Sequence, residues 1–352
     1  MKTFLESDIA EVATALGATA HEFAGKTVLM TGARGFLGRY FNEVFAYLNE
    51  HVLENPCNFV GFDNLMTSGE AGSSVQERPN IRFVKHDVTQ PVEWQEPVHY
   101  VIHAAGIASP FYYRAYPLET LEVAIKGTRN MLEVANKHRA RFTFFSSSEM
   151  YGDPDATHVP TQESYRGNVS CRGPRACYDE SKRVGETLCY IFHENFGTAT
   201  TTIRPFNVYG PGMQESDYRV LPNFASRIKA GKPLSLYGTG VQTRTFCYIS
   251  DALAGFLLAV IKGVPGEAYN IGNPEPEVSM RDLVRTIERV LKRPVQYNVI
   301  EYPDSYPADE PMRRCPDIRK ARLQLNYAPR VPLDEGLRRF LSWTDQVYTG
   351  QN

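Results

Sequence analysis

Short apolar runs separated by amphipathic stretches fill most of the chain. Continuous apolar segments predict buried strands at residues 26–32, 57–64, 81–88, 100–106, 141–148, 199–211 and 267–273. Helical patterns lie between or after several of them, at residues 36–50, 117–138, 178–195 and 251–263. Strands that alternate with helices indicate a parallel sheet covered on both faces. The pattern therefore predicts an α/β fold with a Rossmann-type doubly wound parallel sheet.

The pattern also predicts how the chain is divided. Residues 1–24 read as an N-terminal helical extension, with a helix over 4–22. The main sheet domain spans 25–205, and residues 240–272 return to it. After about residue 270 the elements become shorter and richer in proline, so residues 206–239 and 273–345 are expected to form a smaller C-terminal α/β lobe.

Composition excludes several classes of protein. A net charge of −2 gives no electrostatic footprint for nucleic acid or an anionic membrane. No apolar run approaches the roughly 20 residues of a membrane helix, and the start of the chain is acidic and amphipathic, unlike a signal peptide. The six cysteines lack metal-ligand spacing, so we expect reduced thiols in a cytoplasmic protein without a metal site.

Three glycines occupy the turn after the first predicted strand: Gly32, Gly35 and Gly38 in TGARGFLG. Glycine permits a tight turn and lets backbone N–H groups approach a pyrophosphate at the helix start. Asp63 ends the next strand, where a carboxylate accepts hydrogen bonds from ribose hydroxyls and repels a 2′-phosphate. Alone, such a turn fits a structural role about as well, but in this context it predicts a dinucleotide site that prefers NAD. The predicted cofactor contacts are Gly32, Gly35, Phe36, Leu37, Gly38, Asp63, Asn64, Asp87, Val88, Ala104, Ala105, Tyr178, Lys182 and Pro205.

Tyr178 and Lys182 lie four residues apart in GPRACYDESKR, so both side chains leave one face of a helix. A cation beside a phenol favours the phenolate and lowers its pKa. Such a tyrosine takes a proton from a substrate hydroxyl as hydride leaves the same carbon. Ser147, at the end of the fifth strand, is expected to share that hydrogen bond. A single pair of this kind is more often found on a helix surface, but the cofactor motifs favour catalysis.

The motifs TGARGFLG, HDV, HAAG, SSSEMYG, YDESK and RPFNVYGPG follow one another in a characteristic order. In this order the chain resembles the extended short-chain dehydrogenases/reductases, in the branch that modifies nucleotide sugars. Within that branch, GPRACYDESKRVGET, LYGTGVQTRTFCYISDAL and CPDIRKARLQL are most similar to the UDP-glucuronate decarboxylases, which form UDP-xylose. The resemblance covers nearly the whole chain, from about residue 26 to about residue 340.

The resemblance implies oxidation of C4 with NAD, loss of CO₂ from the resulting β-keto acid, and re-reduction of C4. The implied catalytic residues are Ser147, Ser148, Glu149, Tyr178, Lys182 and Arg244. The implied substrate contacts are Ser109, Glu149, Asn207, Arg219, Val220, Asn223, Tyr237, Gln242, Arg244 and Arg314. Homodimerisation through helices near residues 117–138 and 178–195 is a further implication.

Particular positions bear on which reaction is expected. Glu149 matches a glutamate near C5 and the departing carboxylate, and Arg244 an arginine that stabilises the enolate or supplies its proton. Ser148 stands where 4,6-dehydratases carry an acidic aspartate, which disfavours dehydration because serine is a poor acid. The stretch IASPFYYRAYP departs from the decarboxylase pattern and brings extra aromatic residues toward the expected sugar site.

Two alternatives stay open. One is an NAD-dependent nucleotide-sugar 4-epimerase, such as a UDP-glucuronate 4-epimerase, or another C4 oxidoreductase or dehydratase of this branch. The other is a non-catalytic, NAD-sensing relative that uses the fold for interaction. The intact set of Ser147, Tyr178 and Lys182 speaks against the second alternative.

Overall fold

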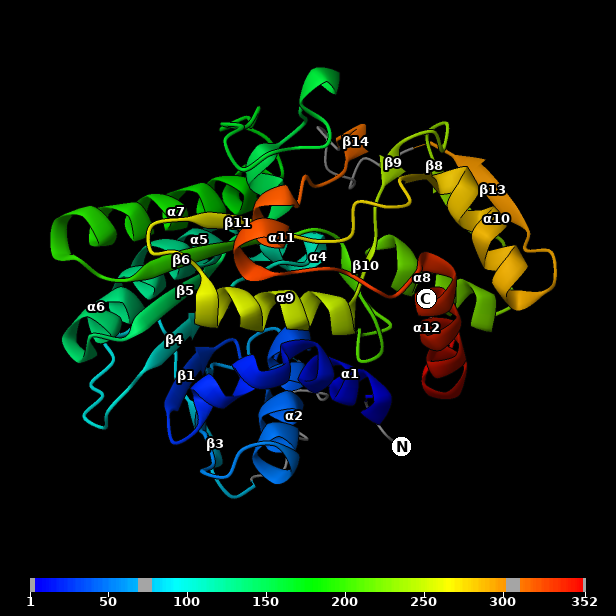
Figure 1. Ribbon diagram of the computed structural model, residues 1–352. Coiled ribbons are helices and arrows are strands. Elements are labelled where there is room, and N and C mark those ends of the chain that lie inside the picture. The colour runs from blue at the N-terminus through cyan, green and yellow to red at the C-terminus, as the bar shows by residue number, and fades with distance from the viewer. Residues whose placement is uncertain (1–3, 69–77, 302–310, 351–352) are drawn as a thin grey trace.

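A seven-stranded parallel sheet forms the centre of the structure, a computed structural model that describes residues 4–68, 78–301 and 311–350 (Figure 1). The strand order is β11-β6-β5-β4-β1-β2-β3, and every neighbouring pair is parallel. The strands are β1 (Thr27–Thr31), β2 (Asn58–Asp63), β3 (Ile81–Lys85), β4 (Tyr100–His103), β5 (Arg141–Phe145), β6 (Thr200–Pro205) and β11 (Ala268–Ile271). The order reverses between β1 and β4, the switch point where doubly wound sheets bind ligands. The predicted fold class is confirmed.

Helices cover both faces of this sheet, which is why its strands are continuously apolar. Val28 and Met30 of β1 belong to the core on one face, and Leu29 between them belongs to the core on the other. The first face is covered by α2 (Phe36–His51) and α9 (Ile249–Lys262), and the second by α6 (Thr128–His138) and α7 (Ala176–Phe196). The predicted helix over 117–138 consists of α5 (Pro117–Glu122), a π-helical turn (Val123–Gly127) and α6.

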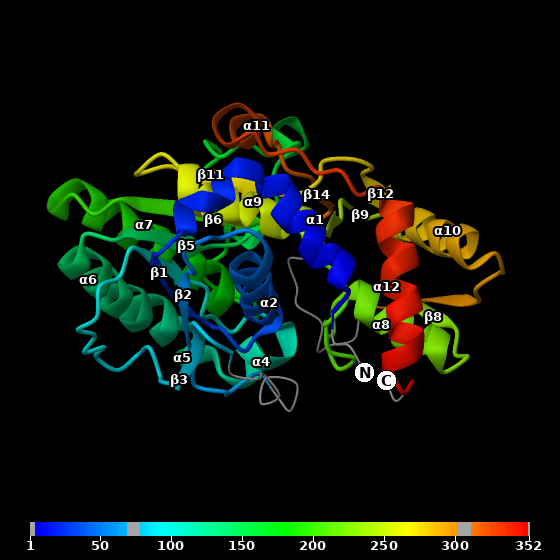
Figure 2. The ribbon, with the colours of Figure 1, turned by 60° about the horizontal axis from the view of Figure 1, so that its bottom comes forward.

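Smaller elements gather beside the sheet, where Figure 2 shows α8, α10 and α12 together with β8. Three short sheets accompany these elements, with the strand orders β10-β7, β12-β9-β14 and β13-β8. The helices are α4 (Pro110–Ala115), α8 (Val220–Lys229), α10 (Met280–Leu291), α11 (Arg319–Leu325) and α12 (Leu333–Val347). The strands are β7 (Val208–Tyr209), β8 (Leu234–Tyr237), β9 (Thr243–Arg244), β10 (Cys247–Tyr248), β12 (Val278–Ser279), β13 (Tyr297–Ile300) and β14 (Arg313–Arg314). The 3₁₀ helices Ser148–Tyr151 and Ala156–His158 follow strand β5.

The N-terminal segment is part of the core. It forms α1 (Glu6–Leu16) and then a 3₁₀ helix (Gly17–Phe23), close to the helix expected over 4–22. Val12, Leu16 and Phe23 are almost completely buried within the cluster that contains α2 and α9. The segment therefore stabilises the sheet side of the molecule as well as preceding it.

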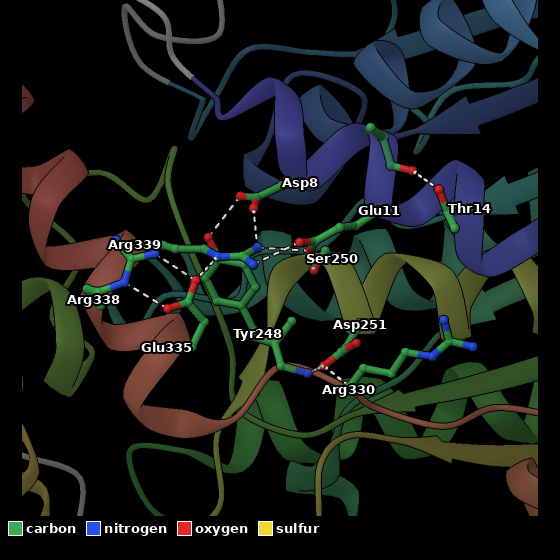
Figure 3. A network of polar contacts seen from close by, with 12 residues as sticks. Asp8, Glu11, Thr14, Tyr248, Ser250, Asp251, Arg330, Glu335, Arg338 and Arg339 are labelled. Atoms are coloured by element: carbon green, nitrogen blue, oxygen red, sulfur yellow. Dashed lines mark hydrogen bonds and ion pairs between the residues drawn. The ribbon is translucent and has the colours of Figure 1, made fainter.

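A buried network of charged and polar groups connects α1 to the C-terminal helix α12 (Figure 3). Asp8 is fully buried and accepts hydrogen bonds from Tyr248 Oη at 2.9 Å and Arg339 Nη1 at 3.1 Å. Arg339 also forms ion pairs with Glu11 and Glu335. Burial raises the pKa of the Asp8 carboxyl to about 6, although Tyr248 and Arg339 oppose the shift. Arg339 is thus the cation that makes a charged Asp8 tolerable between these two helices.

No helix within residues 4–68, 78–301 and 311–350 is long and apolar enough to cross a membrane. The six cysteines are all free thiols: Cys57, Cys171, Cys177, Cys189, Cys247 and Cys315.

Replacing Arg339 with Met should lower the free energy of unfolding at neutral pH by about 3 kcal/mol, because it leaves the buried Asp8 charge without its partner. The folded pKa of Asp8 lies above its unfolded value of 3.8, so protonation favours the folded state as the pH falls through about 6. Part of the loss should therefore be recovered below pH 6. Urea unfolding of both proteins at neutral pH and below pH 6 measures the loss and its recovery.

Arg338→Met is the matched control, because this neighbour on α12 has a side chain that is 62% exposed and forms an ion pair with Glu335. Its effect should stay within about 0.5 kcal/mol. Equal losses in the two variants would contradict the role assigned to Arg339.

Candidate active site

A cavity of about 440 Å³ lies at the carboxyl ends of the strands, between the sheet and the elements around α8. The β1–α2 turn lines one end of it, and residues from β9 and β14 line the other. Parallel strands present their carboxyl ends at one edge, which is where open α/β sheets bind ligands. The cavity therefore has the position expected of an active site.

The glycine turn packs closely against neighbouring backbone at the first end of the cavity. Gly32 has a φ of +72°, and a Cβ there would lie 2.8 Å from the carbonyl oxygen of Ala104. A Cβ on Gly38 would lie 2.3 Å from the carbonyl oxygen of Gly32. Asp63 Oδ2 accepts a hydrogen bond from the Arg34 N–H at 2.9 Å, so the carboxylate is held at the end of β2. These features fit a dinucleotide whose pyrophosphate approaches the backbone closely.

Most predicted cofactor contacts line this cavity. They are Gly32, Gly35, Phe36, Leu37, Gly38, Asp63, Asn64, Val88, Ala104, Ala105, Tyr178, Lys182 and Pro205. Asp87 does not line it. Its Oδ1 accepts hydrogen bonds from the N–H and hydroxyl of Thr89, so the carboxylate closes a local turn and the neighbouring Val88 faces the cavity.

Tyr178 and Lys182 leave α7 on the same side and both line the cavity. Tyr178 forms a hydrogen bond with Ser147, as expected. Lys182 Nζ donates to the carbonyl oxygen of Phe145 at 2.9 Å and lies 5.7 Å from the centre of the Tyr178 ring. Strand β5, helix α7 and the loop after β5 therefore fix the relative positions of these three side chains.

The pKa of Tyr178 is raised, whereas the sequence predicted a lowered value. Burial raises the pKa to about 12, Ser147 lowers it, and the charges of Glu149 and Asp179 raise it again. Lys182 does not offset this, because its ammonium group is directed to Phe145 and burial lowers its own pKa to about 8. The expectation of a lysine-induced lowering was wrong for the protein alone, since desolvation dominates.

Glu149 lies between two arginines. Its Oε2 accepts hydrogen bonds from Arg314 Nη2, at 2.7 Å, and from Arg175 Nη2. Arg175 directly precedes α7, and Arg314 lies in β14, so the carboxylate connects the helix that carries Tyr178 to this distant strand. Arg175 also forms an ion pair with Asp179 at 3.5 Å, and burial raises the pKa of the Asp179 carboxyl.

Arg175 was missed as a site residue by sequence reasoning, although it stands within the stretch GPRACYDE that carried the resemblance. The available signal was its position three residues before Tyr178, which brings both to the start of one helix. Tyr113 was missed as well. It is 2% exposed, its ring stacks on Tyr178 at 5.3 Å, and it lines the cavity. Tyr113 is one of the extra aromatics in the stretch after β4.

The other predicted residues divide into two groups. Ser147, Ser148, Glu149, Asn207, Arg219, Val220, Gln242, Arg244 and Arg314 line the cavity. Ser109, Asn223 and Tyr237 do not. Ser109 occupies the N-cap position of α4, Asn223 lies within α8, and Tyr237 ends β8.

Arg244 and Arg314 lie side by side as register partners in the parallel pairing of β9 with β14. Arg244 is 6% exposed and donates from Nη1 to the carbonyl oxygen of Thr243 at 2.8 Å. With Arg175, these residues surround Glu149 and the adjoining cavity with positive charge. Anionic groups are stabilised in such an environment. No cluster of three or more His, Cys, Asp or Glu suited to a metal ion occurs in the part of the chain that the structure describes.

The model of the NAD dependent epimerase/dehydratase family matches residues 28–272. The chain belongs to this family. UDP-glucuronic acid decarboxylase 6 of Arabidopsis thaliana is 38% identical over 312 residues, which is 88% of this chain and 86% of that protein. UDP-glucuronic acid decarboxylase 1 of Xenopus tropicalis is 36% identical over 90% of this chain and 72% of that protein. The resemblance predicted from the motifs is thus confirmed.

Solved structures show the same fold. An epimerase from Methanothermobacter thermautotrophicus is 27% identical, with a TM-score of 0.78 over 97% of this chain and 96% of that chain. The UDP-glucuronic acid 4-epimerase from Bacillus cereus, solved with UDP-glucuronic acid and NAD, is 25% identical. Its TM-score is 0.75 over 92% of this chain and all of that chain.

Replacing Lys182 with Met tests whether this lysine is held in the site against its desolvation. Folding lowers its pKa from 10.5 to about 8, so the unfolded chain binds more protons between these values. Stability therefore gains a contribution as the pH rises through this window. In Lys182→Met that gain should be smaller by about 2 kcal/mol than in the parent protein, measured by urea unfolding along a pH series.

Lys262→Met is the control, because Lys262 is exposed at the end of α9. Its pH profile should match that of the parent protein. A Lys182→Met profile that also matches the parent would show that Lys182 is not desolvated.

Proposed function

We propose that this protein decarboxylates UDP-glucuronate to UDP-xylose through a 4-keto intermediate. The observation that carries the proposal is the contact of Glu149 with Arg175 and Arg314 beside the Tyr178–Ser147 pair. This arrangement combines a group for C4 oxidation with a cationic environment for a carboxylate. The relatives named UDP-glucuronic acid decarboxylase support it, because their likeness extends over most of the chain.

NAD is the cofactor of the proposal, and the residues that would hold it are those of the glycine turn, Asp63 and the ends of β4 and β6. When bound, NAD accepts hydride from C4 of the sugar and returns it at the end of the cycle. The close approaches at Gly32 and Gly38 support this assignment, because a Cβ at either position would collide with neighbouring backbone and prevent the tight turn that brings N–H groups to a pyrophosphate. The carboxylate of Asp63 favours NAD over NADP, since a 2′-phosphate would be repelled.

Tyr178 is the proposed base that takes the proton from the C4 hydroxyl. Ser147 shares that hydrogen bond and orients the hydroxyl. With a pKa of about 12 in the protein alone, the phenol needs further stabilisation of its anion. The nearby charge of Arg219 lowers the phenol's pKa, and the positive charge of a bound nicotinamide would act in the same direction.

Loss of CO₂ follows from the chemistry of a 4-keto uronic acid. The electrons of the bond between C5 and the carboxyl carbon move into an enolate, whose charge rests on the C4 oxygen beside Tyr178. The phenol that received the proton of the C4 hydroxyl can donate a hydrogen bond to that oxygen. A proton must then reach C5, and we assign this step to the side of the site that holds Glu149 and Arg244.

A 4-epimerase is the second candidate, because the Bacillus cereus structure with UDP-glucuronic acid and NAD shares the fold over 92% of this chain. Epimerisation uses the same first oxidation but keeps the carboxylate and requires the keto sugar to rotate in the site. The cluster of Arg175, Arg314 and Glu149 favours decarboxylation in our proposal.

Incubation of the purified protein with UDP-glucuronate and NAD should convert the substrate to UDP-xylose with release of an equal amount of CO₂. Proton NMR over time, together with trapped CO₂, measures both products. Tyr178→Phe should lose most of the turnover, by a factor of roughly 100 or more, because it removes the acid–base group.

Inversion at C4 with the carboxylate retained would show that the protein acts as an epimerase and not as a decarboxylase. If Tyr178→Phe retained full turnover, the assigned base would be wrong. Lack of any reaction would exclude UDP-glucuronate as the substrate.

We further propose that the protein forms a homodimer through α5, the π-helical turn and α7. Leu118, Ile125, Tyr190 and Ile191 are exposed there, between 37% and 71%. Such apolar surface on adjoining helices favours burial against a second copy. A cytoplasmic location is part of the proposal, supported by the six free cysteines.

Tyr190→Glu should convert the dimer to a monomer, because it places a charge in the proposed interface. Light scattering after size-exclusion chromatography measures the mass. Leu323→Glu is the control, since Leu323 is 86% exposed on α11, outside this surface. A monomeric parent protein would contradict the proposed dimer.

A further inference from the structure

Two exposed aromatic rings from different lobes stack on each other beside the active-site cavity. Phe111 lies in α4, and Tyr218 lies shortly before α8. Their ring centroids are 5.5 Å apart and the ring planes differ by 8°. Tyr218 lines the cavity, and so do Pro110 and Arg219, the chain neighbours of the two rings. The stack therefore joins the two sides of the cavity at its rim.

The two rings remain largely in contact with solvent, since Phe111 is 53% and Tyr218 63% exposed. They are not part of either large hydrophobic core. A single contact between exposed rings can break and re-form far more easily than packing in a core. The pair can therefore separate to admit a ligand without disturbing the lobes themselves.

The chain connects this stack directly to the catalytic tyrosine. Tyr112 packs edge-on against Phe111, and Tyr113 stacks on Tyr178 at 5.3 Å. On the other side of the stack, Tyr218 is followed by Arg219, whose charge lowers the pKa of Tyr178. Phe111 is thus two residues from Tyr113, and Tyr218 is one residue from Arg219. A movement that opens or closes the pair therefore takes place next to groups that adjoin the reacting centre.

The proposed reaction creates a particular need for closure. After CO₂ has left and C5 has taken up a proton, the sugar ring is an uncharged 4-ketone. It has lost the carboxylate that cationic side chains could hold, so only the nucleotide part anchors it. Hydride must still return to C4, and the C4 oxygen must still receive the proton held by Tyr178. Escape before this step would give a free ketone and leave the C4 hydride on the cofactor as NADH, so each such release would consume one added NAD.

We propose that Phe111 and Tyr218 form an aromatic gate that keeps the 4-keto intermediate in the site until C4 is reduced. The gate thereby determines that UDP-pentose is released instead of UDP-4-ketopentose. This inference rests on the proposed function, because it assigns the gate to one intermediate of that reaction. The extra aromatic residues after β4 acquire a role in product specificity.

Phe111→Ala and Tyr218→Ala test the gate. In the parent protein, with added NAD, nearly all of the CO₂ should be matched by UDP-pentose, with a small measurable amount of UDP-4-ketopentose. In each alanine variant, the ratio of released UDP-4-ketopentose to UDP-pentose should rise roughly two- to tenfold, the factor expected for loss of one aromatic pair. Proton NMR separates the two sugars, and trapped CO₂ gives the total number of decarboxylations. Tyr218→Phe keeps the ring and should behave as the parent.

The rate at which UDP dissociates from the NAD-loaded protein gives a readout that needs no catalysis. It should increase by a similar factor in both alanine variants. The double variant should be no faster than either single one, because removal of one ring already breaks the pair. Tyr297→Ala, which removes a 42% exposed ring from β13, is the control and should leave both readouts unchanged.

The outcomes separate the gate from the proposed function. A ratio of UDP-4-ketopentose to UDP-pentose in the alanine variants equal to that of the parent would overturn the gate and leave the decarboxylase assignment intact. Absence of CO₂ with the parent protein would overturn the proposed function. UDP dissociation at the parent rate in the alanine variants would overturn the gate irrespective of the reaction.

Discussion

One carboxylate held by two guanidinium groups connects the two sides of the active-site cavity. Glu149 follows strand β5, Arg175 precedes the helix that carries Tyr178, and Arg314 comes from a strand more than 130 residues further along the chain. Each of these groups is largely buried, so each would be costly without the others. Satisfying their charges therefore constrains how β14 and the elements around it lie against the helix that carries Tyr178.

A second buried cluster makes a similar connection between α1 and α12. Asp8 and Glu11 of the N-terminal helix form ion pairs with Arg339 of α12, and Tyr248 completes the cluster. Tyr248 lies four residues after Arg244 and packs against Tyr209, which lines the cavity. The N-terminal helix thus stabilises the strands and loops that support the substrate end of the site. Such a contribution explains why a segment outside the family motifs is buried in the core.

The site is built at an electrostatic cost. Burial raises the pKa of Tyr178 and lowers that of Lys182, so desolvation opposes the charged form of both residues. Each residue nevertheless keeps a polar contact, Tyr178 with Ser147 and Lys182 with the carbonyl of Phe145, so neither is a purely packing residue. A bound cofactor and substrate would supply the charges that these groups lack in the protein alone. Such an unfavourable desolvation energy is expected where side chains are arranged for a reaction more than for stability.

The sequence by itself determined the sheet, the glycine turn, the position of Tyr178 and Lys182 on one helix face, and the family. Each depends on a local pattern: apolar runs for buried strands, glycine where backbone must approach a ligand, and a spacing of four residues for one helix face. Most predicted contacts accordingly line the cavity. The predicted residues that do not line the cavity stand near a motif but have side chains with local contacts, such as Asp87, which closes its own turn with Thr89.

Only the tertiary structure decided the features that depend on distant residues. The sequence did not identify Arg175 as a partner of Glu149. The two residues belong to different elements, and their contact forms together with Arg314, which lies far along the chain. The direction of the Tyr178 pKa followed from burial, which a one-dimensional pattern does not report. The stack of Phe111 on Tyr218 joins residues more than 100 positions apart. Spacing along the chain predicts which residues share an element, whereas packing decides which elements meet.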